Sequence, residues 1–391
     1  MIKRNYIFII IIFFIILVGD ITLIREQKES SLNENRSLQK FEHFTLNTYL
    51  NGSFQTSLEN ALSDQFIAGE TIKENVKIAL KFFDYNNIPE FICNEKYISL
   101  DGTYYNYNCD DALILKYETL NEETKLNIKK RIEVYNNLNN YIDTYYYFIS
   151  TPSIYNFEKN SYNIDLINIL KENLTNNYTL EALEFNNYDE YIDLFYKTDH
   201  HWNNKGSYKG YKEIISMMYQ DEEIIEPQEE IIFDDIVFYG SAARVSQIFD
   251  FKENFKVYKF NYPNIDILNN KTDDNYGKEE EYFKGIYQKD KLAGHYGEFY
   301  GGDSGEVIFN TNNSKKDNLL ILGSSFTNPI NKLIASHFDK TYVIDLRHYK
   351  DLTNQNFNVK EYINKNKINK VLIIMDYGYL KDQSFNMDWS N

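Results

Sequence analysis

The sequence predicts an α/β protein of three layers, in which helices cover both faces of a mostly parallel β-sheet. Over the last third of the chain, short apolar runs alternate with amphipathic helical segments, which is the pattern of parallel βαβ units with right-handed crossovers. The second observation is size. A chain of 391 residues, 43% hydrophobic and 25% charged, can bury one large core and a smaller satellite, which predicts one or two domains.

The first predicted element is a membrane anchor over residues 1–25. Lys3 and Arg4 precede an apolar run over residues 6–24 that only Asp20 interrupts. At a rise of ~1.5 Å per residue, this run would be roughly 28 Å long as a helix, close to the ~30 Å of bilayer hydrocarbon. The positive flank should stay in the cytoplasm, which predicts a single-pass protein of the cell membrane with its body outside. A cleaved signal peptide is the alternative and would give a secreted protein.

A stalk and N-terminal helices are predicted over residues 26–85. Residues 26–50 are polar and charged, whereas apolar residues recur at helical spacing over residues 53–83, which indicates two amphipathic helices separated at Gly69. The α/β domain is then expected over residues 86–391. Within it, residues 251–316 are polar with some alternating runs, and we interpret them as an insertion of partly β character that serves as a lid.

The elements of the α/β domain follow from the spacing of its apolar residues. Helices are predicted over residues 124–142, 163–174, 328–338 and 358–366, and strands over residues 143–153, 318–323, 341–346 and 370–377. In parallel sheets of this kind, ligands bind beyond the carboxyl ends of the strands. The turn that follows residues 318–323 is therefore where chemistry is expected.

The two cysteines are a candidate disulfide. Cys93 and Cys109 are the only cysteines of the chain. In an exported protein an even pair indicates a disulfide, and closing a loop of this length would stabilise the fold by roughly 3 kcal/mol. Two unpaired thiols are the alternative, because spacing alone does not establish pairing.

The charge of the chain excludes one class of partner. Asp and Glu number 58 against 41 Lys and Arg, for a formal net charge of −17. A nucleic-acid-binding protein needs clustered lysine and arginine to contact phosphates. We therefore expect no nucleic-acid partner, and neutral or cationic partners are favoured.

A serine after a strand is the first candidate for chemistry. In "LLILGSSFTNPI", Ser325 lies two residues past Gly323, which permits a tight turn, and just before a predicted helix. The unpaired N–H groups at a helix start and its positive end would stabilise a developing oxyanion, which suits a nucleophile. Ser324 and Ser325 are equally good helix N-caps, and capping is the commonest reason for serine before a helix.

The string "TDHHW" over residues 198–202 supplies a candidate acid and base. In an extended segment, residues i and i+2 project to the same face. Asp199 and His201 can therefore share one side, as the orienting acid and the base of a hydrolase, while His200 points away. Asn203 or Asn204 would cap the helix that follows, which puts the motif at a loop-to-helix junction.

Metal chemistry is the alternative for these side chains. Zinc sites combine spaced histidine or cysteine ligands, and His295, His337 and His348 form no recognisable set with residues 199–201. We therefore expect no metal and no other cofactor.

The motif also carries a family resemblance. "TDHHW" followed by "NNKGSYKGY" resembles the signature of the DHHW proteins, relatives of the alginate O-acetylation proteins AlgJ and AlgX in the SGNH hydrolase-like superfamily. "ENRSLQKF", "NGSFQTSLENALSDQF" and "YVIDLRHY" resemble further parts of that family. The resemblance implies an SGNH hydrolase-like fold and a triad with Asp199 as the acid, His201 as the base and Ser325, in "GSSF", as the nucleophile. His200 then occupies the variable position of the motif.

The resemblance implies a cell-surface O-acetyltransferase or acetylesterase that acts on an exported polysaccharide through an acetylated Ser325. Water or a sugar hydroxyl would take the acyl group, and by analogy with the relatives a membrane-bound O-acyltransferase would supply it. The alternative from another class is a noncatalytic cell-surface scaffold or glycan-binding protein that keeps the fold. Its exposed aromatic rings would stack on sugars.

Several further residues are candidates for contacts with the substrate. The N–H of Ser325 would be one oxyanion donor. Ser324 in the same turn, and Gly240 or Arg244 in "FYGSAAR", are candidates for the others, although a Gly-Ser turn followed by a surface arginine is the plainer interpretation. Trp202 is either a substrate contact or part of the core beside the motif.

Overall fold

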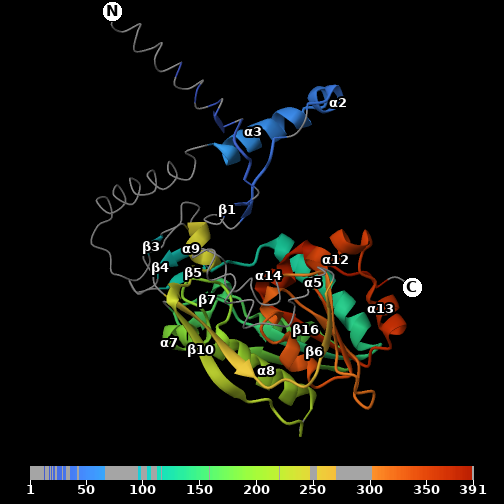
Figure 1. Ribbon diagram of the computed structural model, residues 1–391. Helices are drawn as coiled ribbons and strands as arrows, with labels where there is room; N and C mark the ends of the chain where they lie inside the picture. The colour runs from blue at the N-terminus through green and yellow to red at the C-terminus, as the bar shows by residue number, and fades with distance from the viewer. Residues whose placement is uncertain are drawn as a thin grey trace, which may run out of the picture.

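The structure is a computed structural model of the chain. It describes residues 117–157, 159–219, 221–246, 253–269 and 302–389, and shorter stretches within residues 13–66, 96–106 and 112–115 (Figure 1). The predicted disulfide between Cys93 and Cys109 and the second of the two N-terminal helices lie outside the described residues. Among the described residues, none of the helices is both long and apolar enough to cross a membrane.

A seven-stranded sheet forms the centre of the molecule, in the order β12-β13-β15-β14-β16-β6-β9. The last five strands of this order are parallel, and β13 and β12 add to one edge in antiparallel fashion. This confirms the mostly parallel sheet. The strands are β6 Asp143–Ile149, β9 Tyr178–Leu183, β12 Asp266–Asn269, β13 Glu306–Asn310, β14 Leu319–Leu322, β15 Lys340–Ile344 and β16 Lys370–Met375.

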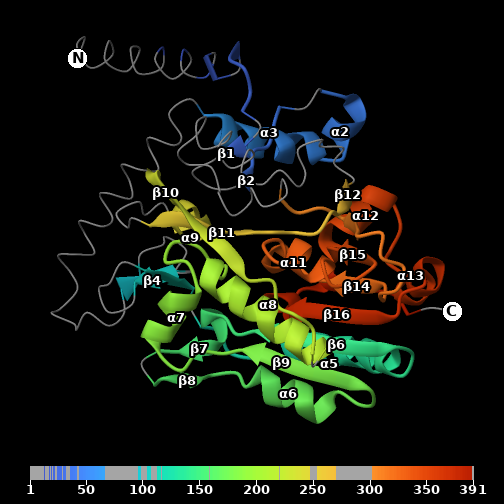
Figure 2. The same cartoon turned by 60° about the horizontal axis from the view of Figure 1, so that its bottom comes forward.

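The alternation of strand side chains gives the sheet two buried faces. In β14, for example, Leu319 and Ile321 belong to one core and Leu320 and Leu322 to the other. Residues of α7 Tyr188–Leu194, α8 Asn204–Met218 and α11 Asn331–Ala335 pack into the first core. Residues of α5 Glu122–Asn139, α6 Leu166–Asn173, α12 Leu346–Thr353, α13 Val359–Asn366 and α14 Tyr377–Lys381 pack into the second. Helices therefore cover both faces, and Figure 2 shows α8 and α6 on opposite sides of β9.

Smaller elements surround this centre. They are α2 Leu46–Leu50, α3 Ser53–Gln65, α9 Ser241–Ser246, β1 Ser30–Ser31, β2 Arg36–Ser37, β3 Lys96–Tyr97, β4 Tyr104–Asn106, β5 Leu113–Leu115, β7 Tyr155–Asn156, β8 Ser161–Tyr162, β10 Pro227–Val237 and β11 Asn254–Phe260. Single 3-10 turns cover Pro152–Ile154, Ser325–Thr327 and Gln383–Phe385. The first predicted N-terminal helix corresponds to α3.

Two parts of the fold differ from what the sequence predicts. The expected helix over residues 328–338 is shorter, because a 3-10 turn, Ser325–Thr327, follows β14 and α11 begins only at Asn331. The described part of residues 251–316 contains strands, as expected, but two of them belong to the central sheet. There, β11 pairs with β10, while β12 and β13 extend the central sheet. The division of the chain into three domains stays a prediction.

Candidate active site

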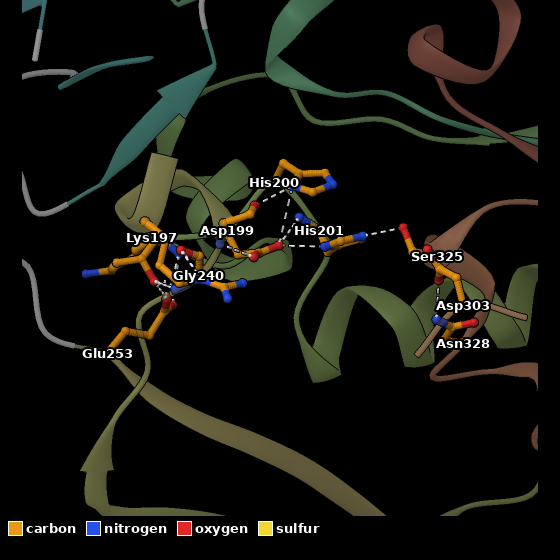
Figure 3. A network of polar contacts seen from close by, with 12 residues as sticks. Lys197, Asp199, His200, His201, Gly240, Glu253, Asp303, Ser325 and Asn328 are labelled. Atoms are coloured by element: carbon orange, nitrogen blue, oxygen red, sulfur yellow. Dashed lines mark hydrogen bonds and ion pairs between the residues drawn. The ribbon is translucent and has the colours of Figure 1, made fainter. Parts of the chain in front are cut away.

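The structure brings together three side chains that lie up to 126 positions apart in sequence. His201 Nδ1 lies 2.6 Å from Asp199 Oδ1, and His201 Nε2 lies 2.7 Å from Ser325 Oγ (Figure 3). Ser325 opens the 3-10 turn that follows β14, at the carboxyl edge of the parallel strands. The structure thus places the three predicted residues within hydrogen-bond distance of one another, and their chemical roles stay a prediction.

The loop of residues 197–203, called here the motif loop, connects α7 to α8. Phe195 and Trp202 form an isolated antiparallel bridge, and the N–H of Tyr196 donates to the carbonyl of His201 at 3.1 Å. The side chain of Asn203 caps α8 by accepting from the N–H groups of residues 205 and 206. Of the two cap candidates, Asn203 is therefore the one used.

Trp202 belongs to the core. Its side chain is fully buried, and the space it fills is left by two glycines of α8. A Cβ at Gly210 would lie 2.6 Å from Trp202 Cζ3, and one at Gly206 would lie 3.0 Å from Trp202 Cβ. Of the two roles considered for Trp202, packing is the one that the structure supports, and it anchors the end of the motif loop.

Asp199 is buried and surrounded by hydrogen-bond donors. Its carboxylate accepts from the N–H and Nδ1 of His201, at 3.0 and 2.6 Å, and from the N–H of Ser241 at 2.6 Å. Burial alone would raise the pKa of Asp199, but the charge of the two neighbouring histidines and these hydrogen bonds hold it well below its usual range. An ionised Asp199 keeps the proton of His201 on Nδ1, which leaves Nε2 as an acceptor for the hydroxyl of Ser325.

Gly240 lies behind Asp199, which corrects its prediction as an oxyanion donor. Its N–H already donates to Thr198 Oγ1 at 3.1 Å. A Cβ at this position would lie 2.3 Å from Asp199 Cβ and 2.6 Å from the carbonyl oxygen of Thr198. Only glycine lets the turn approach the motif loop this closely. The plainer interpretation of Arg244 as a surface residue is also wrong, because Arg244 is buried and its Nε contacts the carbonyl of Gly240 at 3.4 Å.

The turn of residues 324–328, called here the nucleophile turn, is held partly by a contact that the sequence did not predict. Ser324 is buried and extended, and its side chain makes no cap hydrogen bond. Asn328 Nδ2 donates to Asp303 Oδ1 at 3.0 Å, and Arg347 donates to Asp303 Oδ2 at 2.9 Å and to Asp345 Oδ2 at 2.5 Å. "YVIDLRHY", quoted above for the resemblance, contains two of these residues, but nothing in the sequence connects them to Ser325.

Glu253 is a second residue that sequence reasoning missed. Its carboxylate accepts from the N–H of Lys197 at 2.9 Å, and from the N–H and Oγ1 of Thr198 at 3.2 and 3.1 Å. Burial raises the pKa of Glu253 to about 7, although these hydrogen bonds act to lower it. Glu253 precedes β11, inside the segment expected to be an insertion, and it fixes the start of the motif loop.

Two groups of described residues have side chains close enough to share a metal ion. They are Asp199 with His200 and His201, and Asp303 with Asp345 and His348, in each of which the ligand atoms lie within 4.8 Å of one another. Each group already has other partners: His201 connects Asp199 to Ser325, and a guanidinium pairs with both carboxylates of the second group. The structure therefore gives these side chains hydrogen-bonding roles.

A hollow lies beside the motif loop, between α8, β11 and α11. Its empty space is about 440 Å³, a figure that includes space open to solvent. Aromatic side chains dominate its lining, with Tyr208, Tyr258, Phe260 and Tyr262 next to Trp202 and Pro329. It does not include Ser325, although Pro329 follows the nucleophile turn directly.

No protein-family model matches the chain, and neither does any curated protein. Among solved structures, that of Bacillus cereus PatB1 with a sulfonyl adduct is 19% identical, covers 73% of this chain and 97% of that chain, and has a TM-score of 0.53. A DHHW family protein from Eubacterium siraeum is 18% identical, with coverage of 72% and 93% and a TM-score of 0.49. AlgX of Pseudomonas aeruginosa is 12% identical, with coverage of 71% and 63% and a TM-score of 0.32. The likeness to PatB1 is one of fold.

Proposed function

We propose that this chain is a cell-surface O-acetyltransferase or acetylesterase that acts on an exported polysaccharide through a serine nucleophile. The observation that carries the proposal is the pair of hydrogen bonds of His201, to Asp199 on one nitrogen and to Ser325 on the other. An acid, a base and a hydroxyl in this order are the arrangement that activates serine in acyl transfer on unrelated folds.

The reaction follows from the protons that these groups hold. His201 Nε2 accepts the hydroxyl proton as Ser325 Oγ attacks the acetyl carbonyl, and Asp199 stabilises the imidazolium that forms. The imidazolium then gives this proton to the leaving oxygen, and the acetyl group stays on Ser325 as an ester. An acceptor hydroxyl attacks that ester and passes its proton to His201, which returns it to Ser325 Oγ. Water as the acceptor gives hydrolysis, and a sugar hydroxyl gives transfer.

Two further observations support a reactive serine. PatB1, which shares the fold, is described with a sulfonyl adduct, and a sulfonyl group forms such an adduct by bonding to a nucleophile. In addition, Ser325 lies where the carboxyl ends of parallel strands meet, the edge at which such sheets bind ligands.

The compartment and the partners are part of the same proposal. Residues 1–25 would hold the chain in the cell membrane with its body outside, or would be removed to give a secreted protein. A membrane-bound O-acyltransferase would deliver acetyl groups to Ser325. The support for both is the apolar N-terminal run and the resemblance of the motifs.

Turnover of 4-nitrophenyl acetate by the chain without residues 1–25 tests the proposal. Ser325→Ala and His201→Ala should each lower turnover by about 10³-fold or more. A sulfonyl fluoride should label Ser325 in the wild type, as peptide mass spectrometry would detect, and should label neither variant. Equal turnover in the wild type and both variants would reject the triad.

A noncatalytic glycan-binding protein is the second candidate, favoured by the aromatic lining of the hollow beside α8. Tyr258 and Phe260 are half-buried there, and aromatic faces of this kind stack on sugar rings. Protein that binds a neutral oligosaccharide but takes no sulfonyl label at Ser325 would favour this candidate over the enzyme.

A further inference from the structure

The motif contains a second imidazole that the triad does not use. The ring of His200 lies against that of His201, with centroids 3.9 Å apart and planes inclined by 36°, and it meets the ring of Phe326 edge-on at 6.1 Å. Its side chain is 39% exposed, against 8% for His201. His200 therefore lies at the surface of the site, beside the base rather than behind it (Figure 3).

One nitrogen of His200 is held in place. Nδ1 lies 2.6 Å from Ser241 Oγ and 3.7 Å from Asp199 Oδ1. The nearby carboxylate favours a proton on Nδ1, which makes Nε2 an acceptor. Among the described residues, Nε2 has no hydrogen-bond partner.

Partial burial, together with neighbouring charges, favours the neutral form of this ring by lowering its pKa. Burial of the ring and the charge of His201 lower the pKa of His200, and Arg347 acts in the same direction, while Asp199 and Asp303 oppose it. A neutral imidazole near pH 7 can accept a hydrogen bond, whereas an imidazolium cannot. His200 thus offers an acceptor at the surface of the site, next to the group that takes the proton of the attacking hydroxyl.

We propose that His200 is a specificity-determining residue whose Nε2 accepts a hydrogen bond from the hydroxyl next to the one that is acetylated, so that the site prefers acceptors with vicinal hydroxyls. This inference rests on the proposed function and names the acceptor chemistry of the same site. One hydroxyl gives its proton to His201 and attacks acetyl-Ser325, while its neighbour donates to His200. Sugars carry such neighbouring hydroxyls, whereas water and simple alcohols do not.

Three small alcohols test the preference with 4-nitrophenyl acetate as the acetyl donor. Propane-1,2-diol has neighbouring hydroxyls, propane-1,3-diol has the same two hydroxyls further apart, and propan-1-ol has one. The measured quantity is the amount of acetylated alcohol divided by the amount of acetate. The wild type should give a ratio about fivefold higher for propane-1,2-diol than for the other two alcohols, the size of effect that a single hydrogen bond produces.

Two variants of His200 identify the nitrogen responsible. Asn places its amide where Nδ1 lies, and Gln places its amide where Nε2 lies. His200→Asn should therefore abolish the preference for propane-1,2-diol, while His200→Gln should keep most of it. His348→Asn is the matched control, because His348 is similarly exposed at 44%, and it should keep the full preference.

The outcomes separate the inference from the function beneath it. Equal ratios for the three alcohols in the wild type, a preference that survives in His200→Asn, or hydrolysis with no transfer to any alcohol would each overturn the role of His200 and leave the triad standing. A wild type that neither releases nitrophenolate nor takes a sulfonyl label at Ser325 would overturn the proposed function itself. A melting temperature of His200→Asn close to that of the wild type shows that this variant is folded.

Discussion

The two halves of the triad are held in place by different means. In the motif loop, the carboxylates of Asp199 and Glu253 accept from backbone N–H groups, and Trp202 fills space left by two glycines. The nucleophile turn instead follows a central strand, and a side-chain contact between Asn328 and Asp303 steadies its far end. Changes to the motif loop should therefore affect both stability and activity, whereas loss of the partly buried Asn328–Asp303 contact should affect activity more than stability.

The largest effect is expected from the isosteric change Asp199→Asn. The amide would no longer hold the proton of His201 on Nδ1, and turnover of 4-nitrophenyl acetate should fall by about 10³-fold or more. The matched change in the other half is Asp303→Asn, which should cost about tenfold, because Asp303 contacts Asn328 and not the base. Similar losses in the two variants would remove the distinction between the halves.

Gly240→Ala should have the next largest effect and should lower both stability and turnover. The added methyl group would meet Asp199 Cβ at 2.3 Å, and such overpacking costs about 1–3 kcal/mol. Displacing the acid should also lower turnover by about 10²-fold. Thermal melts and turnover measure the two effects. Gly378→Ala is the control, because a Cβ at Gly378 would meet nothing nearer than a carboxylate oxygen of Asp376 at 3.1 Å. Equal effects of Gly240→Ala and Gly378→Ala would contradict the close packing of Gly240 against Asp199.

Asn328→Leu tests whether the nucleophile turn can loosen while the fold stays intact. The variant loses the hydrogen bond to Asp303, and we expect about a tenfold lower rate of sulfonyl labelling at Ser325. The melting temperature should stay close to that of the wild type, since the contact is only partly buried. A large fall in melting temperature would mean that the turn is as much a part of the core as the motif loop.

The smallest expected effect is a pH dependence of stability that comes from Glu253. Burial raises the pKa of Glu253 from its ordinary 4.5 to about 7 in the folded chain. The folded state therefore binds this proton more tightly than the unfolded state, so the associated stability is present below about pH 4.5 and is lost as the pH rises through 7. Glu253→Gln should gain stability relative to the wild type between pH 5 and pH 8, by at most about 3 kcal/mol.

Denaturant unfolding of both proteins at the two pH values measures this change. A stability difference that is the same at pH 5 and pH 8 would mean that Glu253 stays ionised in the folded chain.

The sequence predicted Asp199 and His201, which are close in sequence, and it also predicted Ser325, but it did not predict how Ser325 meets them. Asp199 and His201 are two positions apart, which makes them neighbours in any local conformation. The bend over residues 197–201 that lets Asp199 accept from both the N–H and Nδ1 of His201 is seen only in the structure. Ser325 was predicted from its place after an apolar strand. Its meeting with His201 depended on the resemblance, because no local pattern records which loops a sheet brings together.

The sequence did not reveal the roles of Glu253 and Asp303, because both act through contacts that are distant in sequence. Glu253 and Asp303 act through hydrogen bonds to residues more than 20 positions away, and a lone carboxylate in a polar segment looks like a solvated surface residue. Gly240 was named as a candidate oxyanion donor, with a plain Gly-Ser turn as the alternative interpretation. Only the packing reveals that the missing side chain makes room for Asp199. The helix predicted over residues 328–338 is shorter in the structure, because residues 328–330 after the 3-10 turn form turns and α11 covers only Asn331–Ala335.

The position of β14 in the sheet has a consequence for the rate at which its amide protons exchange with solvent. β14 has β15 on one side and β16 on the other, and its four residues are completely covered, so its amide protons should exchange with deuterium only when the whole domain opens. Local openings that release the edge strand β12 leave this segment intact. Ser325 follows this segment closely in sequence, so its position should change little when the edge of the sheet opens.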